Sequence, residues 1–200
     1  MRRRIGSMCT AAAAIDCVCS GSAEAHLNST GMGPLYDGLS HFITSPEDIV
    51  PVVALALLAG LRGPEYGRRA LFVLPASWFA GCLLGALARQ PITWPVAAVS
   101  FLVFGGLVAA DARLSVRSLT ALAVLLGIVH GWMNGAGVRW TGSMFAVYAG
   151  LVAGISILVA LVSALVIQLR PPWTRIVVRV AGSWIVATGI LLLGWARHAA

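Results

Sequence analysis

Two short stretches of the sequence carry side chains that can bind a cation or pass on a proton. The first is HFITSPED, in which the imidazole of His41 precedes the carboxylates of Glu47 and Asp48. The second is VHGWMNG, in which Asn134 follows His130 by four residues and therefore lies on the same face of a helix. Both stretches adjoin or lie within long apolar runs. Ionisable side chains are costly inside a membrane, so these residues are candidates for a functional site.

Imidazole, carboxylate and amide groups form a plausible ligand set for a divalent first-row metal ion. The same groups can form a proton relay, and spacing does not separate the two. A structural alternative also exists, because Ser45 and Pro46 are typical of a helix start. Glu47 and Asp48 are favourable in a first helical turn, and Asp48 stands at a capping-box spacing from Ser45. His130 can likewise be a neutral imidazole bonded to a neighbouring backbone.

The two stretches are expected at a similar depth in the membrane. At about 1.5 Å per helical residue, Asp48 lies about 21 Å from Arg62. By the same rule, His130 lies about 20 Å from Arg117. If both arginines stand at the inner boundary, one outward-facing polar pocket can form from His41, Glu47, Asp48, His130 and Asn134.

His26 offers a separate, weaker metal site. Cleavage after Ala25 would make His26 the first residue of the mature chain. Its α-amine and imidazole can then chelate one metal ion together, and affinity order favours copper. The alternative is a polar N-terminal segment that binds nothing.

The composition places all of these residues in a membrane protein. The chain has 200 residues, of which 59% are hydrophobic and 10% charged, and its mean hydropathy is +0.89. We therefore predict an all-α, polytopic helical membrane protein. The net charge of +7 comes from arginine, since lysine is absent. The arginines stand singly or in small groups between apolar runs, which indicates membrane topology rather than nucleic-acid binding.

Three segments are expected along the chain. Residues 1–25 resemble a signal peptide, with MRRR before an apolar stretch and AEA at the cleavage site, although an uncleaved first helix is the alternative. Residues 26–44 form an extracytoplasmic segment with a short or re-entrant helix. Residues 45–200 form a six-helix transmembrane domain. Its expected spans are Ser45–Leu61, Tyr66–Leu87, Ile92–Ala110, Ser118–Ala136, Ser143–Leu169 and Thr174–Trp195.

The arginines also predict the orientation of the chain. With the mature N-terminus outside, the inner loops carry Arg62, Arg68, Arg69, Arg113, Arg117, Arg170, Arg175 and Arg179. The outer side carries Arg89, Arg139 and Arg197. This asymmetry follows the positive-inside rule and places both mature termini on the periplasmic side of a bacterial inner membrane.

Glycines and tryptophans follow patterns that membrane helices use. Gly127, Gly131 and Gly135 recur every four residues beside the His130 face and would let a partner helix approach closely. Several tryptophans lie near predicted span ends, as interfacial belts require, and we expect no chemistry of them. They are Trp78, Trp94, Trp140, Trp173 and Trp195.

At these motifs the chain resembles the HupE/UreJ family, membrane proteins linked with hydrogenase and urease operons and regarded as nickel/cobalt permeases. The family pattern is H-P-x-x-G-x-D-H in the first mature helix and H-G-x-A-H-G in a later one. Glu47 stands where the family has aspartate, while Asp48 and Asn134 stand where it has histidines. The matching residues are His41, His130, Gly131 and Gly135.

The resemblance implies a protein that binds and transports a divalent transition-metal cation, such as nickel, cobalt or copper, within the lipid bilayer. One alternative is a non-transporting accessory protein that works with metalloenzyme maturation proteins, and the scarcity of polar residues in the inner half favours it. Another is an intramembrane metalloenzyme with Glu47 as its base. No H-E-x-x-H or G-x-S-x-G motif is present, so we do not expect an enzyme.

Overall fold

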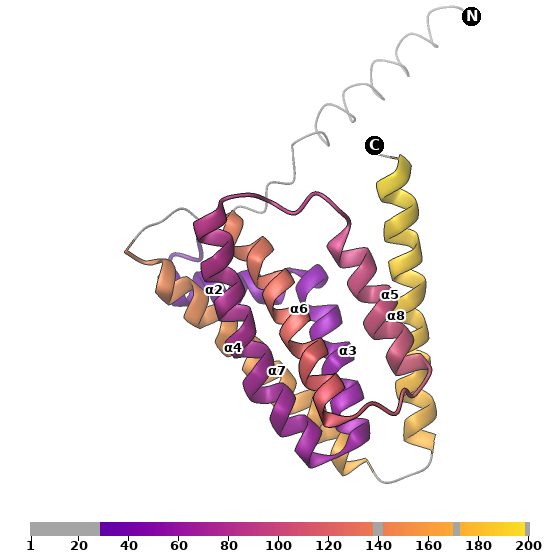
Figure 1. Cartoon of the computed structure of the whole chain (residues 1–200). Coiled ribbons are helices and arrows are strands. Elements are labelled where there is room, and N and C mark those ends of the chain that lie inside the picture. The colour runs from indigo at the N-terminus through magenta and orange to yellow at the C-terminus, as the bar shows by residue number, and fades with distance from the viewer. Residues whose placement is uncertain (1–28, 138–141, 170–172, 199–200) are drawn as a thin grey trace, which may run out of the picture.

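The described part of the chain is a bundle of helices. The computed structural model describes residues 29–137, 142–169 and 173–198, and these contain seven helices and no strand (Figure 1). The helices are α2 (Pro34–Thr44), α3 (Pro46–Arg62), α4 (Pro64–Ala88), α5 (Val96–Ala109), α6 (Val116–Ala136), α7 (Met144–Gln168) and α8 (Trp173–His198). The expected signal peptide, His26 and Trp140 lie outside the described residues.

Each apolar segment predicted from the sequence contains a helix, and most boundaries agree within three residues. The largest difference is the start of α5, expected at Ile92 and found at Val96. Pro91 and Pro95 explain it, because proline disfavours a helical conformation at the preceding residue and lacks the N–H that a helix needs. Residues 90–95 therefore form a loop.

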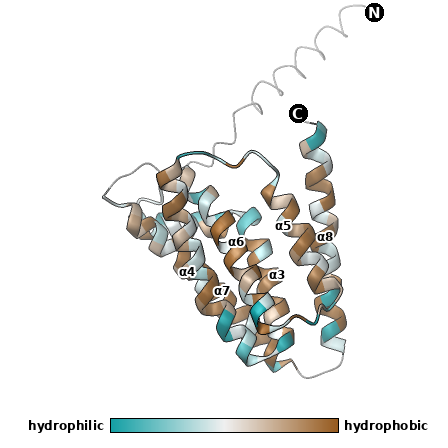
Figure 2. Ribbon diagram, in the orientation of Figure 1, coloured by the Kyte–Doolittle hydropathy of each residue, from teal (hydrophilic) through white to brown (hydrophobic). Residues whose placement is uncertain are grey.

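Four of the described helices are long and apolar enough to cross a membrane, namely α4, α6, α7 and α8. The helices α2 and α3 pass the same test only as a pair, bent by 75°. Helix α5 has 14 residues, or about 21 Å, against a hydrocarbon core of about 30 Å. Figure 2 shows hydrophobic residues along the helices and hydrophilic ones near several helix ends. The chain is thus a polytopic helical membrane protein, while the count of six spans stays a prediction.

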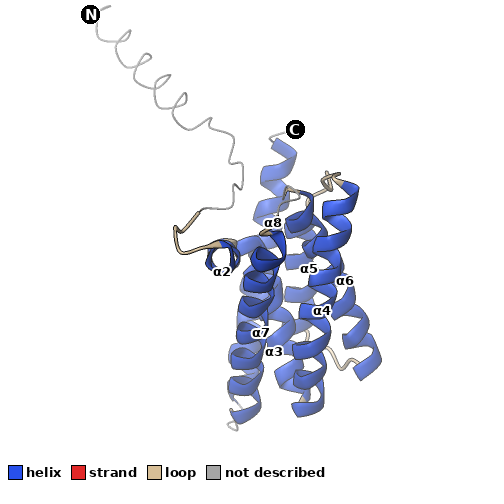
Figure 3. Cartoon of the chain, turned by 90° about the vertical axis from the view of Figure 1, so that its left-hand side faces the viewer, coloured by secondary structure: helices blue, strands red, loops and turns tan. Residues whose placement is uncertain are grey.

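Helix α2 lies across one end of the bundle. Figure 3 views α2 nearly along its axis, while the long helices run down the page. Two glycines let α2 approach α7 closely: a Cβ on Gly38 would overlap the carbonyl of Val147, and a Cβ on Gly150 would overlap the carbonyl of Leu35. The sequence predicts a short or re-entrant helix in residues 26–44, and α2 occupies the second half of that segment.

Glycines also bring α6 into backbone contact with α4. The face formed by Gly127, Gly131 and Gly135 lies against α4. A Cβ on Gly131 would overlap the carbonyl of Trp78, and a Cβ on Gly135 would overlap the carbonyl of Cys82. The partner helix of this glycine face is therefore α4, and no larger residue fits there without moving a backbone.

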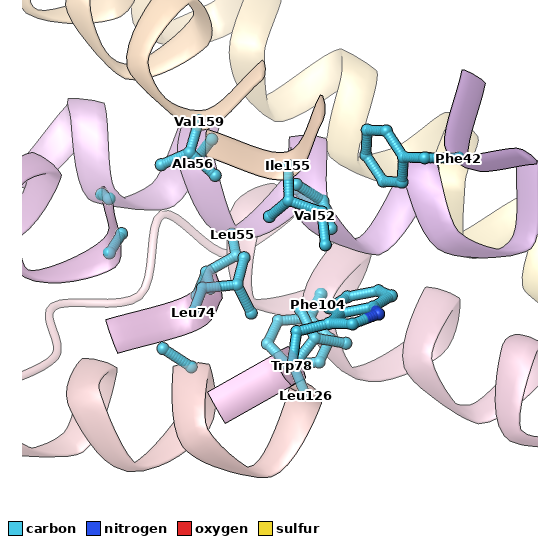
Figure 4. Packing of buried hydrophobic residues seen from close by; sticks show 14 of the residues in the cluster. Phe42, Val52, Leu55, Ala56, Leu74, Trp78, Phe104, Leu126, Ile155 and Val159 are labelled. Atoms are coloured by element: carbon cyan, nitrogen blue, oxygen red, sulfur yellow. The ribbon is translucent and has the colours of Figure 1, made fainter. Parts of the chain in front are cut away.

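Helices α5 and α8 form a second close pair, in which Gly182 packs against the backbone of Gly105. Helix α3 lies between this pair and the other helices, and it contacts α4, α5 and α7. The side chains of Val52, Leu55 and Leu58 on α3 are completely buried. Figure 4 shows part of this core, where apolar side chains from α3, α4, α6 and α7 meet.

One prediction about the tryptophans is wrong. Trp78 does not belong to an interfacial belt, because it lies in the middle of the 25-residue helix α4 and is completely buried. Trp94, Trp173 and Trp195 are exposed and lie near or beyond helix ends. The buried environment of Trp78 comes from the glycine face of α6, which brings the two helices together.

The end of the bundle opposite α2 is called here the arginine-rich end, because most of the described arginines lie there. Asp111, in the loop between α5 and α6, pairs with Arg62 of α3 and with Arg175 of α8, the latter at 2.8 Å. The hydroxyl of Tyr66 donates a hydrogen bond to the carbonyl of Leu114 at 3.0 Å. These bonds tie α3, α4 and α8 to the same loop.

Candidate functional site

Glu47 and Asp48 are adjacent acids in the first turn of α3, and their side chains point in different directions. Pro46 occupies the first helical position, and the carbonyl of Ser45 accepts the Asp48 N–H at 3.0 Å. The side chain of Ser45 makes no capping hydrogen bond, so the capping box predicted from its spacing to Asp48 is wrong. Successive helical residues are about 100° apart. Glu47 is therefore exposed, whereas Asp48 is buried.

His130 lies opposite Asp48 at the contact between α6 and α3. Its side chain is 2% exposed, and its Nδ1 lies 2.9 Å from Oδ1 of Asp48. Its Nε2 lies 2.8 Å from the hydroxyl of Ser100 on α5. The indole ring of Trp78 lies against the imidazole, with 5.4 Å between ring centroids. Hydrogen bonds and ring contact therefore fix the imidazole from three sides.

Asn134 connects this pair to α2. Its Nδ2 donates to Oδ2 of Asp48 at 2.9 Å and to the carbonyl of His130 at 3.0 Å. Its Oδ1 lies 2.7 Å from Nε2 of His41. Because the amide oxygen only accepts, His41 donates this bond from a protonated Nε2. The result is a continuous line of hydrogen bonds from Ser100 through His130, Asp48 and Asn134 to His41.

The network, as it is called below, consists of Ser100, His130, Asp48, Asn134 and His41. Four of its members are sequence-predicted site residues that come from three helices. Glu47, the fifth candidate that the structure describes, has no bonding partner among the described residues and lies outside the network. His26, the sixth, lies outside the described residues.

Sequence reasoning missed Ser100 and Trp78. Ser100 is one hydroxyl in the apolar run of α5, and nothing in its spacing links α5 with α6. Trp78 carried a detectable signal, since a tryptophan in the middle of an apolar span does not fit an interfacial position.

The carboxylate of Asp48 sets the tautomer of the imidazole. An ionised carboxylate only accepts hydrogen bonds, so Nδ1 of His130 carries the hydrogen that it shares with Asp48. In the neutral ring, Nε2 then holds the lone pair and accepts from the Ser100 hydroxyl. A carboxylate that orients a histidine in this way leaves the other nitrogen free to act as a metal ligand. The network can thus present one nitrogen ligand, with Asp48 behind it.

The donor set suits a weakly held cation. Among the described residues, no three His, Cys, Asp or Glu side chains gather closely enough to hold a metal ion by themselves. The network adds an amide and a hydroxyl to its imidazoles and its carboxylate. Oxygen and nitrogen donors of this kind fit a divalent cation that is passed on rather than kept.

Comparison with models of known protein families assigns the chain to one of them. The model of the HupE/UreJ proteins matches residues 13–192, which include both polar stretches and most of every described helix. The chain belongs to the HupE/UreJ family. This confirms the resemblance based on the two motifs. No curated protein and no solved structure matches the chain.

Membership in the HupE/UreJ family associates the chain with the handling of nickel or cobalt, either as a transporter or as an accessory protein. The geometry adds a feature of this chain. Asp48 and Asn134, which stand where the family pattern has histidines, bond directly to each other. The two residues that differ from the family pattern therefore contact each other, and they form a hydrogen bond between α3 and α6.

Proposed function

We propose that this HupE/UreJ protein binds a divalent transition-metal cation of the nickel, cobalt or copper class and moves it across the membrane. The observation that carries the proposal is the buried pair of Asp48 and His130, which lies where α2 and α3 form a broken helix. Transporters use broken helices of this kind to build ion sites. The cation is the cargo of the site.

The charge balance of the pair supports a cation. The side chain of Asp48 is 6% exposed, and its described partners are His130 and Asn134, neither of which carries a permanent positive charge. A buried carboxylate without a fixed countercharge is costly in a membrane. A divalent cation bound at the neighbouring His130 Nε2 would supply the missing charge.

The outer part of the network supports access from the α2 end. His41 and Asn134 are half-buried, while His130 and Asp48 are buried. Exposure therefore rises along the line of hydrogen bonds from His130 towards α2. We place this end on the periplasmic side, because the arginine-rich end is expected to face the cytoplasm.

Measurement of bound metal tests the proposal. The full chain would be purified in detergent, loaded with Ni²⁺ or Co²⁺ and analysed for metal content. We expect about one ion per chain in the wild type and little in His130→Ala or Asp48→Asn. Ser156→Ala is the matched control, since Ser156 lies on α7 and bonds its own helix backbone. Equal metal content in all four proteins would overturn the proposal.

A second candidate function, a non-transporting accessory protein, is favoured by the apolar layer beyond the site. Leu126 lies one turn from His130 towards the arginine-rich end, Leu55 lies two turns from Asp48, and both are buried. Beyond them, a cavity of about 360 Å³ is lined in part by Arg62 and Arg175, whose charges do not attract a cation. Metal uptake into vesicles containing the purified protein separates the two functions. Binding without uptake would favour the accessory role.

A further inference from the structure

Ser100 is the member of the network that reaches His130 from α5. The residue is buried, and its Oγ lies 2.8 Å from Nε2 of His130. This nitrogen is the one that Asp48 leaves free for a ligand. The hydroxyl of Ser100 therefore occupies the position from which a cation would be bound.

Ser100 differs from other hydroxyl residues in the described helices. Seven of these donate to the carbonyl four residues earlier in their own helix, at 2.6–3.2 Å. They are Thr44, Ser77, Thr120, Ser156, Ser163, Ser183 and Thr188. Bonds of this kind are the usual way in which an intramembrane hydroxyl is satisfied. The hydroxyl of Ser100 is instead directed to another helix.

The same local bond is available to Ser100. The carbonyl four residues earlier belongs to Val96, in the first turn of α5. Rotation of the side chain about its Cα–Cβ bond can carry the hydroxyl from His130 to this carbonyl, between staggered positions that serine adopts readily. The hydroxyl can therefore leave Nε2 without losing a hydrogen-bond partner in the membrane.

We propose that Ser100 is a displaceable cap on Nε2 of His130. Its hydroxyl bonds this nitrogen when no cation is bound, and it turns to the Val96 carbonyl when a divalent cation takes its place. The inference rests on the proposed function, because it names the contact that the cargo must displace. The cap keeps the imidazole satisfied and in its ligand-ready tautomer, and it weakens cation binding enough to permit release.

The test compares Ni²⁺ affinity in detergent among variants of the full chain. Ser100→Ala removes the competing bond, so we expect Ni²⁺ to bind about three- to tenfold more tightly, as the loss of one net hydrogen bond predicts. Ser100→Thr keeps a hydroxyl and is expected to bind within about twofold of the wild type. Ser156→Ala is the matched control and should leave affinity unchanged. General damage to the fold would weaken binding, which is the opposite direction.

Three results would overturn the proposal that Ser100 caps Nε2 of His130. Weaker binding in Ser100→Ala with normal binding in Ser156→Ala would make Ser100 a ligand. Unchanged binding in Ser100→Ala would show that the hydroxyl does not compete. Metal binding that does not depend on His130, judged by His130→Ala, would overturn the proposed function and the cap together, so this failure is distinct from the first two.

A spectroscopic measurement tests the cap without metal. In protein labelled with ¹⁵N-histidine, the signals of His130 can be assigned by their loss in His130→Ala. A hydrogen bond to Nε2 lowers the ¹⁵N chemical shift of that nitrogen, so we expect the shift to rise in Ser100→Ala and to stay near the wild-type value in Ser100→Thr. An unchanged shift in Ser100→Ala would contradict the bond between Ser100 and His130.

Discussion

The two ends of the bundle each hold a buried or partly buried aspartate, and their surroundings differ. At the α2 end, the side chain of Asp48 is 6% exposed and bonds an imidazole and an amide. At the arginine-rich end, the side chain of Asp111 is 20% exposed and bonds two guanidinium groups, from Arg62 and Arg175. The first carboxylate lacks a permanent countercharge, and the second has two.

We propose that this difference separates a cation-binding site at Asp48 from a structural clamp at Asp111. Arginine is always protonated in proteins, so the charge of Asp111 is neutralised at all times and its pairs can hold α3, α8 and the α5–α6 loop together. Histidine changes its charge near neutral pH, and its neutral ring is a metal ligand. Under the proposed function, Asp48 is therefore the carboxylate whose charge a cation would balance. Matched substitutions at the two ends can test this contrast.

The largest expected effect comes from removing the charge of Asp48. Asp48→Asn keeps a side-chain oxygen for the His130 N–H and removes the negative charge, so we expect Ni²⁺ affinity to fall by about a hundredfold or more. Asp111→Asn should leave the affinity within about twofold of the wild type. Titration of both variants with Ni²⁺ gives the comparison. Equal losses at the two positions would remove the distinction between site and clamp.

A second prediction compares the helix packing at the two ends. Gly131, beside His130, faces the Trp78 carbonyl, and a Cβ there would overlap the backbone of α4. Gly131→Ala should therefore lower the free energy of unfolding by about 1–3 kcal/mol. A Cβ on Gly67, near the arginine-rich end, would come no closer than 3.4 Å to the side-chain atoms of Ile167 and Ser163. Gly67→Ala should change stability by less than about 1 kcal/mol.

Thermal unfolding in detergent, followed by circular dichroism, measures both glycine variants. Metal affinity should also fall in Gly131→Ala, because a shift of α4 moves Trp78 away from the imidazole. A stable Gly131→Ala protein with wild-type affinity would mean that the glycine face does not position His130.

A third prediction concerns the clamp itself. Asp111→Asn removes one charge from a partly buried cluster, so we expect the free energy of unfolding to fall by about 1 kcal/mol. Salt screens exposed ion pairs, so the difference between Asp111→Asn and the wild type should shrink at high ionic strength. Chemical unfolding at low and high NaCl concentrations measures it. A difference that grows with salt would contradict an ionic role for Asp111.

The sequence predicted the helices well, because apolar periods and proline positions act locally. The helix boundaries of α3, α6 and α7 follow from the lengths of apolar runs, whereas the predicted start of α5 at Ile92 did not allow for Pro91 and Pro95. Helix length also gave Asp48 and His130 a similar depth. Depth alone does not determine which way each side chain points around its helix axis. The contact between Asp48 and His130 depends on the packing of α3 against α6.

The role of Ser100 and the environment of Trp78 depend on long-range packing. The sequence does not state that α5 lies beside α6, so the bond from Ser100 to His130 had no local signal. The glycine face of α6 did predict a close partner helix, but not that α4 would supply it. The capping-box spacing at Ser45 was misleading, because the Asp48 carboxylate bonds His130 and Asn134, while the Ser45 N–H donates to the carbonyl of Phe42.

The smallest expected effect comes from changing Glu47, the acid next to Asp48 in α3. Glu47 is exposed and has no bonding partner among the described residues, whereas Asp48 bonds both His130 and Asn134. Glu47→Gln should therefore change Ni²⁺ affinity by less than about threefold and stability by less than about 0.5 kcal/mol, the usual range for a surface substitution. The same Ni²⁺ titration in detergent measures it beside Asp48→Asn. A loss in Glu47→Gln as large as that in Asp48→Asn would mean that the Glu47 carboxylate also acts on the bound cation, which requires the first turn of α3 to rotate or unwind when the ion binds.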